Sequence, residues 1–145
     1  MNTKGANGVG RFSIQFEVAN NDDMAATRRG DLDPEKVRSF TITGVVDSGA
    51  TRLVLPKAVI KKLGLPATEK VKVRYADGRR GTRAAAEGVY VEIQGRHGIF
   101  TAIVEPKRKN ALIGAIVLED LDYLIDCTNQ RLVPRDPRFV VNEIE

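Results

Sequence analysis

The chain has 145 residues, with 23 Lys and Arg against 19 Asp and Glu, one His and one Cys. A single Cys excludes an intramolecular disulfide, and one Cys with one His is too few for a Cys/His zinc site, which takes about four ligands. The formal net charge is +4, but charges of both signs are interspersed and aromatic residues make up only 6% of the chain, which argues against a nucleic-acid-binding protein.

No stretch approaches the ~18 apolar residues that a transmembrane helix needs, and the first ten residues contain no apolar run. We therefore expect a soluble, cytoplasmic protein with no membrane partner. The length favours one domain with a real core, because a chain of about 150 residues buries roughly 70% of its surface on folding. We predict that this domain spans 12–134, between tails at 1–11 and 135–145.

The first half of the chain mixes predicted strands and short helices. Residues 12–18 alternate strictly between apolar and polar side chains, which is typical of a half-buried strand. Asn and Asp residues before 22–29, and a Gly after it, predict a short helix there. Residues 37–46 are rich in β-branched side chains and predict a strand that ends at Asp47. A helix is expected over 57–63, between a Pro and a Gly.

From there onward the pattern is mostly β. An Asp-Gly pair at 77–78 is a strong hairpin-turn signal, and a second hairpin turn is expected at 95–98. The other predicted elements are strands at 70–75, 79–86, 89–93, 99–104, 112–114, 123–127 and 131–133, and a small helix at 115–121. Short, closely spaced strands with two or three short helices predict a mainly β fold built as a closed or partly closed β-barrel.

One motif stands above the background of the sequence, the run VVDSGAT at 45–51. With equal residue frequencies, Asp followed by Ser or Thr, Gly and Ala occurs by chance in roughly 0.2% of chains of this length. The apolar strand would carry Asp47 to the floor of a cleft. Ser48 and Gly49 would turn the chain tightly and leave backbone N–H groups free to hold the carboxylate.

A lone carboxylate can do little peptide chemistry, whereas a pair can do much more. Two Asp carboxylates about 3 Å apart cannot both ionise, so they share one proton. One is then a general base toward water, and the other a general acid toward the peptide carbonyl. We interpret Ser48 as a structural hydroxyl and not as a nucleophile, because the sequence positions no base beside it.

The motif resembles the active-site loop of the retropepsin-like aspartic proteases, the single-domain relatives of retroviral protease. In that family the loop is followed by a flap hairpin, a second hairpin ending near a Pro, and two apolar residues and a Gly that lead into a short helix. The matching segments are 71–86, VEIQGRHGIFTAIVEP at 91–106, and 112–114 before AIVLEDL. Order and spacing agree over about 12–134. The resemblance implies a closed barrel of the retropepsin-like acid protease type that hydrolyses peptide bonds without a metal or cofactor.

The resemblance also implies a role for each residue of the motif. Asp47 would be the catalytic aspartate, and Ser48 would hydrogen-bond to the partner's loop. Gly49 would keep the carboxylates coplanar and offer its carbonyl to the substrate, with Ala50 and Thr51 completing the loop. The flap and substrate-binding residues would be Tyr75, Ala76, Asp77 and Gly78, and the loop would be supported from beneath by Leu112, Ile113 and Gly114.

A homodimer is expected, because the motif occurs once and the chain is about half the length of a two-lobed pepsin-like enzyme. A two-fold axis would bring Asp47 against its counterpart in a second copy. In the resembling family the chain termini help to form the interface. The apolar run Phe139-Val140-Val141 is therefore the candidate intersubunit strand, and the alternative is a frayed tail. The implied partners are a second copy of the chain and a peptide or protein substrate.

Other interpretations remain open. One alternative is a dimeric peptide-binding or scaffold domain that keeps this fold without turnover, and a weaker one is a basic accessory protein that binds nucleic acid. Asp77, Arg79 and Arg80 depart from the Gly-rich flap tips of the viral members. Arg79, Arg80 and Arg83 either steer acidic substrates into the cleft or form a solvated face. His97 is expected in an exposed hairpin turn, and Cys127 in the core.

Overall fold

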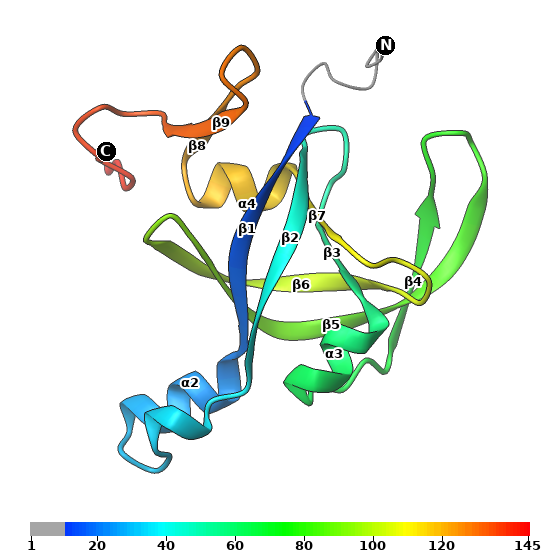
Figure 1. Cartoon of the computed structure of the whole chain (residues 1–145), viewed down its shortest axis with the longest axis vertical. Helices are drawn as coiled ribbons and strands as arrows, with labels where there is room; N and C mark the ends of the chain where they lie inside the picture. The colour runs from blue at the N-terminus through cyan, green and yellow to red at the C-terminus, as the bar shows by residue number, and fades with distance from the viewer. Residues whose placement is uncertain (1–10) are drawn as a thin grey trace.

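A computed structural model of the chain describes residues 11–145 (Figure 1). The elements are β1 (Arg11–Asn20), α2 (Asn21–Arg28), a 3₁₀ turn (Pro34–Lys36), β2 (Ser39–Asp47), β3 (Leu53–Pro56), α3 (Lys57–Leu63), β4 (Glu69–Arg74), β5 (Arg80–Ile93), β6 (Arg96–Glu105), β7 (Ala111–Ile113), α4 (Ala115–Asp120), β8 (Tyr123–Asp126) and β9 (Arg131–Pro134). Residues 135–145 form no helix or strand. The predicted N-terminal tail lies outside the described residues except for Arg11, which is already part of β1.

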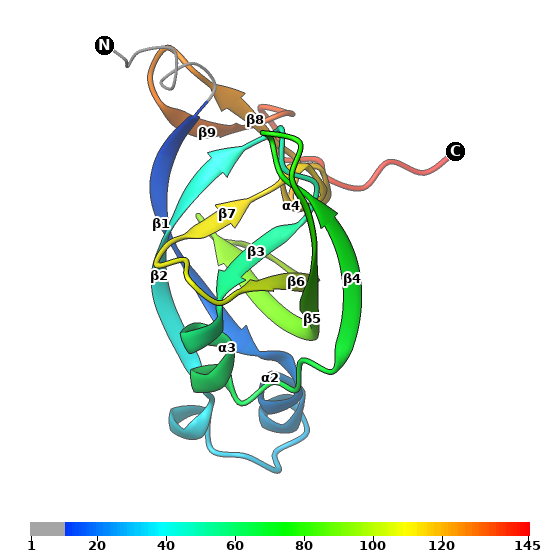
Figure 2. The same ribbon diagram turned by 90° about the vertical axis from the view of Figure 1, so that its right-hand side faces the viewer.

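Six strands close into a barrel in the order β1, β2, β7, β3, β6, β5, and β5 pairs back to β1. The β2–β7 and β3–β6 pairs are parallel, whereas β1–β2, β1–β5 and β5–β6 are antiparallel. Strand β4 pairs with the first half of β5, and this hairpin projects from the barrel (Figures 1 and 2). The predicted mainly β fold with a closed barrel and short helices is confirmed.

Inward-facing positions recur at every second residue of each strand. In this barrel those positions are occupied by apolar side chains, and the interior is therefore apolar. Along β1, the buried Phe12, Phe16 and Val18 alternate with exposed polar residues. Helix α4 covers one end of the barrel with two buried side chains, Val117 and Leu118. The largest fully buried side chains are Leu53, Leu55, Leu63, Ile93, Ile113, Val18, Val46, Val89, Val91 and Val117.

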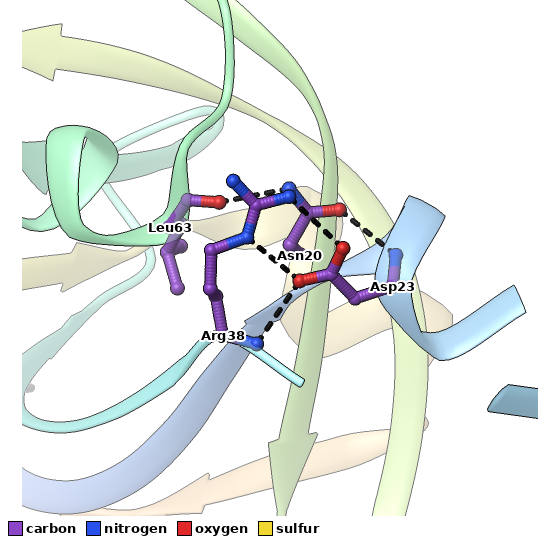
Figure 3. A network of polar contacts seen from close by, with 4 residues as sticks. All are labelled: Asn20, Asp23, Arg38 and Leu63. Atoms are coloured by element: carbon purple, nitrogen blue, oxygen red, sulfur yellow. Dashed lines mark hydrogen bonds and ion pairs between the residues drawn. The ribbon is translucent and has the colours of Figure 1, made fainter. Parts of the chain in front are cut away.

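A polar network joins β1, α2 and α3 at the end of the barrel opposite α4 (Figures 1 and 3). Asn20 caps α2 by accepting the N–H of Asp23 at 3.1 Å, and its amide donates to the carbonyl of Leu63 at 2.8 Å. Asp23 accepts three hydrogen bonds from Arg38, from its backbone N–H and two guanidinium nitrogens, at 2.8 to 3.0 Å. Gly64 leaves room for this guanidinium, because a Cβ there would lie 2.0 Å from Nη1 of Arg38.

Two strands differ from the sequence-based expectation. Strand β3 was not predicted, because the short run LVLP precedes a helix and carries no alternation of its own. It is a strand because the barrel pairs it in parallel with β6 and, at Val54, antiparallel with Leu112 of β7. The predicted strands 79–86 and 89–93 are one continuous strand, β5, interrupted only by a register shift between Ala86 and Val89.

Cys127 was expected in the core and is exposed instead. It lies just beyond β8, in the exposed turn that joins β8 to β9. Apolar character alone does not distinguish a turn position from an interior one. Within residues 11–145 no helix is long and apolar enough to cross a membrane.

Candidate active site

Asp47 is the last residue of β2, at the barrel end that α4 covers. The strand carries it there because Val46, one residue earlier, is fully buried and is paired in parallel with Ile113 of β7. The Oδ1 atom of Asp47 accepts the backbone N–H of Gly49 at 2.9 Å, as the turn after the strand predicts. The Asp47 side chain is 21% exposed. It is therefore anchored and still open to solvent.

The loop after Asp47 is fastened to the start of α4. The N–H of Ala50 donates to the carbonyl of Asp47 at 3.1 Å, which closes the turn. The N–H groups of Ala115 and Ile116 donate to the carbonyls of Ala50 and Thr51 at 2.8 and 3.0 Å. These backbone bonds hold the loop whatever side chains it carries.

The residues predicted to support the loop lie against it. Gly114 is in contact with the loop backbone, and a Cβ there would lie 2.5 Å from the carbonyl oxygen of Arg52 and 2.8 Å from that of Ala50. Ile113 is fully buried, and Leu112 pairs with Val45 across the β2–β7 ladder. The structure thus places the set 112–114 beside Asp47.

Arg11 is a residue of the site that the sequence did not indicate. Its Nη2 lies 3.0 Å from Oδ2 of Asp47, and the two residues are directly opposite each other in the β1–β2 ladder. Their side chains are 47% and 21% exposed, so the ion pair lies at the surface. The contact follows from the register of the β1–β2 ladder. Once Ile14 is placed opposite Gly44, Arg11 lies opposite Asp47 three residues further along.

The predicted flap residues form the tip of the β4–β5 hairpin, which points to the same end of the barrel as Asp47 (Figures 1 and 2). Its turn is closed by the N–H of Gly78, which donates to the carbonyl of Tyr75 at 2.9 Å, and Gly78 has φ +90°. Asp77 accepts from the backbone and side chain of Arg79 at 3.0 and 2.8 Å. Those bonds lower the pKa of Asp77 below its ordinary value. Ala76 is exposed in the same turn.

The side chain of Tyr75 is bound by the last residue of β6, Glu105. Its hydroxyl donates to Glu105, and this bond raises the pKa of Tyr75. Arg83 donates to the other Glu105 oxygen at 2.9 Å. Although burial raises the pKa of Glu105, the bonds from Tyr75 and Arg83 outweigh it and hold the pKa below its ordinary value. The cluster ties the flap to the end of β6.

The remaining candidates lie elsewhere. His97, expected in the hairpin turn, is instead the second residue of β6, where it is exposed and stacks on Tyr90 with ring centroids 5.4 Å apart. Within residues 11–145, the carboxylate of Asp47 has hydrogen bonds or ion pairs with Gly49 and Arg11 only. Across the same residues, no three His, Cys, Asp or Glu side chains gather closely enough to hold a metal ion. Within the described residues of a single subunit, no second carboxylate is hydrogen-bonded to Asp47.

A closed barrel with an Asp-Ser-Gly loop at the end of one strand, a projecting flap and a Gly-supported loop defines the retropepsin-like class. The family described as "gag-polyprotein putative aspartyl protease" matches residues 35–120. This match covers more than half of the chain, and the protein belongs to that family. Its sequence matches no curated protein. The chain is similar to the solution structure of the simian foamy virus (mac) protease, with 17% identity, a TM-score of 0.43, and coverage of 54% of this chain and 80% of that one.

Proposed function

We propose that this chain is a homodimeric aspartic endopeptidase in which two copies of Asp47, one from each subunit, activate a water molecule between them. The observation that carries the proposal is the setting of Asp47. The carboxylate is anchored by the Gly49 N–H, its loop is fastened to α4 by two backbone hydrogen bonds, and it stays partly open to solvent. Preorganised and accessible carboxylates of this kind suit general acid–base catalysis.

The chemistry needs a second carboxylate, which a two-fold axis through the Asp47 end would supply. With the pair sharing one proton, the ionised member removes a proton from water as the water attacks the scissile carbonyl. The protonated member donates to the carbonyl oxygen, and proton transfer to the amine nitrogen then releases the products. Because the pair titrates as a unit, the rate should be bell-shaped in pH with an acidic to mildly acidic optimum.

Exposed apolar side chains support a subunit interface at this end. Of the large hydrophobic residues exposed within 11–145, all but Ile99 lie after residue 115: Ile116, Leu124, Phe139, Val140, Val141 and Ile144. Ile116 is the second residue of α4, and its N–H is one of the two that bind the active-site loop. The candidate intersubunit strand at 139–141 is irregular in the single subunit, and its pairing with a second copy belongs to the proposal.

The first experiment compares wild type with Asp47→Asn on a diverse peptide library over a range of pH, with products read by mass spectrometry. The amide keeps the shape of the side chain but cannot share a proton in the same way, so cleavage products should disappear. Equal products from both proteins would overturn the enzyme assignment. If both proteins bind library peptides and neither cleaves them, the non-catalytic peptide-binding alternative replaces it.

The second experiment tests the shared site by mixing subunits. Asp47→Asn is added to a constant amount of wild type, so that mixed dimers carry a single carboxylate. If subunits exchange freely, activity should fall to about one half at equal amounts and about one tenth at ninefold excess. Serum albumin at the same concentrations is the control. Activity that is indifferent to the added variant would show that Asp47 does not act in pairs between subunits.

A further inference from the structure

The outer face of the flap hairpin carries a row of cations, Lys70, Lys72 and Arg74 on β4 and Arg80 on β5. We call these four residues the cationic flap face. All four are exposed, whereas the residues between them, Val71, Val73 and Gly81, are half-buried, as strand alternation requires. Arg83 belongs to the opposite face, where it is bound by Glu105.

This face has no internal charge compensation. Within residues 11–145 none of its four cations forms an ion pair or a side-chain hydrogen bond, while Arg79 and Arg83 of the same hairpin are both paired with carboxylates. Arg74 and Arg80 are directly opposite each other in the ladder. Like charges at directly opposed positions destabilise a strand pair. The arrangement therefore costs stability in the isolated domain, and an anionic partner would offset that cost.

The backbone beside these cations is also unpaired. In the described part of the chain β4 hydrogen-bonds with β5 alone and forms the edge of the sheet (Figure 2). An extended chain can add to such an edge through main-chain hydrogen bonds. Its side chains at every second position would then lie on the cationic face, about 6.8 Å apart, at the same spacing as Lys70, Lys72 and Arg74. Opposite charges at such cross-strand positions are favourable.

We infer that the cationic flap face docks an extended acidic polypeptide segment with carboxylates at alternate positions, in a part of the protein substrate outside the cleft. This inference rests on the proposed function in one respect, which is that the acidic segment belongs to a protein substrate. Lysines on β4 also protect an edge strand from aggregation. That role does not account for Arg80, which is on β5 directly opposite Arg74.

A polypeptide fits this face better than a nucleic acid does. Single-stranded nucleic acids are held largely by stacking of bases on aromatic side chains. The hairpin's aromatic residue, Tyr75, has its hydroxyl bound by Glu105 and its ring covered by Arg79 and Arg83, whose guanidinium carbons lie 4.8 and 5.5 Å from its centroid. The cationic face itself adds only Thr82 and Ala84 to its four cations.

The binding test uses a fluorescent decapeptide of alternating Glu and Thr, with the Asp47→Asn protein so that no turnover intervenes. Controls are the same peptide with Gln for Glu, a peptide with the five Glu in one block, and a thymidine decanucleotide. Fluorescence anisotropy should show the alternating peptide binding several-fold more tightly than the block peptide, and more weakly as salt rises. Equal binding of the two acidic peptides, or binding of the oligonucleotide at least as tight, would overturn the proposal.

The variant test combines Arg74→Gln and Arg80→Gln, which keep exposed polar side chains on the hairpin. Affinity for the alternating peptide should fall about 2- to 30-fold, the range for two exposed ion pairs. Arg28→Gln with Arg29→Gln on α2 removes the same charge from two exposed sites elsewhere and should leave binding unchanged. Thermal melts verify that both doubles fold. Unchanged binding in the flap double, or an equal loss in the α2 double, contradicts the assignment.

A cleavage arm separates this proposal from the function on which it rests. A peptide cleaved by the wild type is extended with the alternating Glu–Thr segment or with its Gln counterpart. The acidic version should have the higher kcat/KM, and the Arg74→Gln, Arg80→Gln double should remove that advantage. If the wild type cleaves no peptide of the library while the acidic peptide still binds, the protease function is contradicted and the docking face is not. If cleavage occurs with no preference, the docking face fails alone.

Discussion

Two aspartate–arginine pairs stand at opposite ends of the β1–β2 ladder. At one end Asp23 is bound to Arg38 by three hydrogen bonds, and its side chain is 12% exposed. At the other, Asp47 has a single bond from Arg11 and one from the Gly49 N–H, and it is 21% exposed. The first carboxylate joins α2 to the segment before β2 through three hydrogen bonds, whereas the second accepts only two and is more exposed.

The difference shows how the same residue types serve structure in one place and chemistry in another. A carboxylate that accepts several charge-assisted hydrogen bonds is held in its ionised form and stabilises the fold. A carboxylate that must take up and release a proton needs fewer fixed partners and contact with water. The two ends of the ladder therefore predict opposite responses to the same substitution, and the following changes test that contrast in order of decreasing effect.

Asp47→Asn should abolish peptide cleavage, by roughly 10²–10⁴-fold, because the pair can no longer exchange a proton. The free energy of unfolding should change by less than about 0.5 kcal/mol, since the amide oxygen still accepts the Gly49 N–H at a partly exposed site. Urea titrations alongside activity assays measure both. A large stability loss with retained activity would reverse the roles of the two aspartates.

Gly114→Ala should damage both stability and activity. The added Cβ would lie 2.5 Å from the carbonyl oxygen of Arg52, which is backbone and cannot rotate away. We expect a loss of about 1–3 kcal/mol in the free energy of unfolding, the usual cost of overpacking. Cleavage should fall even at temperatures where the variant is fully folded, because the active-site loop must shift. Wild-type activity in the folded variant would separate the loop from catalysis.

Asp23→Asn should produce the converse of Asp47→Asn. The amide loses its charged contacts with Arg38, and we expect about 1–2 kcal/mol of destabilisation, moderated by the exposure of the guanidinium. The kcat at a temperature where the variant is folded should remain that of the wild type. Thermal denaturation and initial rates measure the two quantities, with Asp31→Asn, at an exposed Asp–Arg pair, as the matched control. A kcat loss comparable to that of Asp47→Asn would contradict the structural role.

The same contact predicts how stability depends on pH. The side-chain hydrogen bond from Arg38 holds the folded-state pKa of Asp23 below its ordinary value of 3.8. A lowered folded-state pKa adds stability that is present above the unfolded-state value and is lost as pH falls through the folded-state value. The stability gap between wild type and Asp23→Asn should therefore be constant near pH 6 and shrink below about pH 4. Denaturant titrations from pH 6 to pH 2.5 would show it, and a gap that widens toward acid contradicts it.

The smallest expected effect is that of Arg11→Met on stability. The ion pair between Arg11 and Asp47 is exposed, so its removal should lower the free energy of unfolding by less than about 1 kcal/mol. Arg29→Met, at another exposed ion pair, is the control, and urea titrations measure both variants. A loss as large as that of Asp23→Asn would contradict the contrast between the two ends of the ladder.

Local patterns in the sequence predict many of the elements that the structure contains. Alternation over 12–18, the end of a strand at Asp47 and the Asp-Gly turn at 77–78 depend on near neighbours, and the structure has them where the pattern predicts. The support of the loop by 112–114 was implied by resemblance, and in the structure Gly114 lies in contact with the loop backbone. Strand β3 escaped prediction because four apolar residues without alternation do not distinguish a strand from the approach to a helix.

Residue periodicity and one contiguous motif were sufficient to predict the class of fold and the single acidic loop, because both are local features. The contact of Arg11 with Asp47 across 36 residues, the convergence of Tyr75 and Arg83 on Glu105, and the exposure of Cys127 are apparent only in the folded chain. The same is true of Arg74, which lies opposite Arg80 beside an open strand edge. Such placements follow from ladder register and strand order, which join distant segments and leave no signal in a local window.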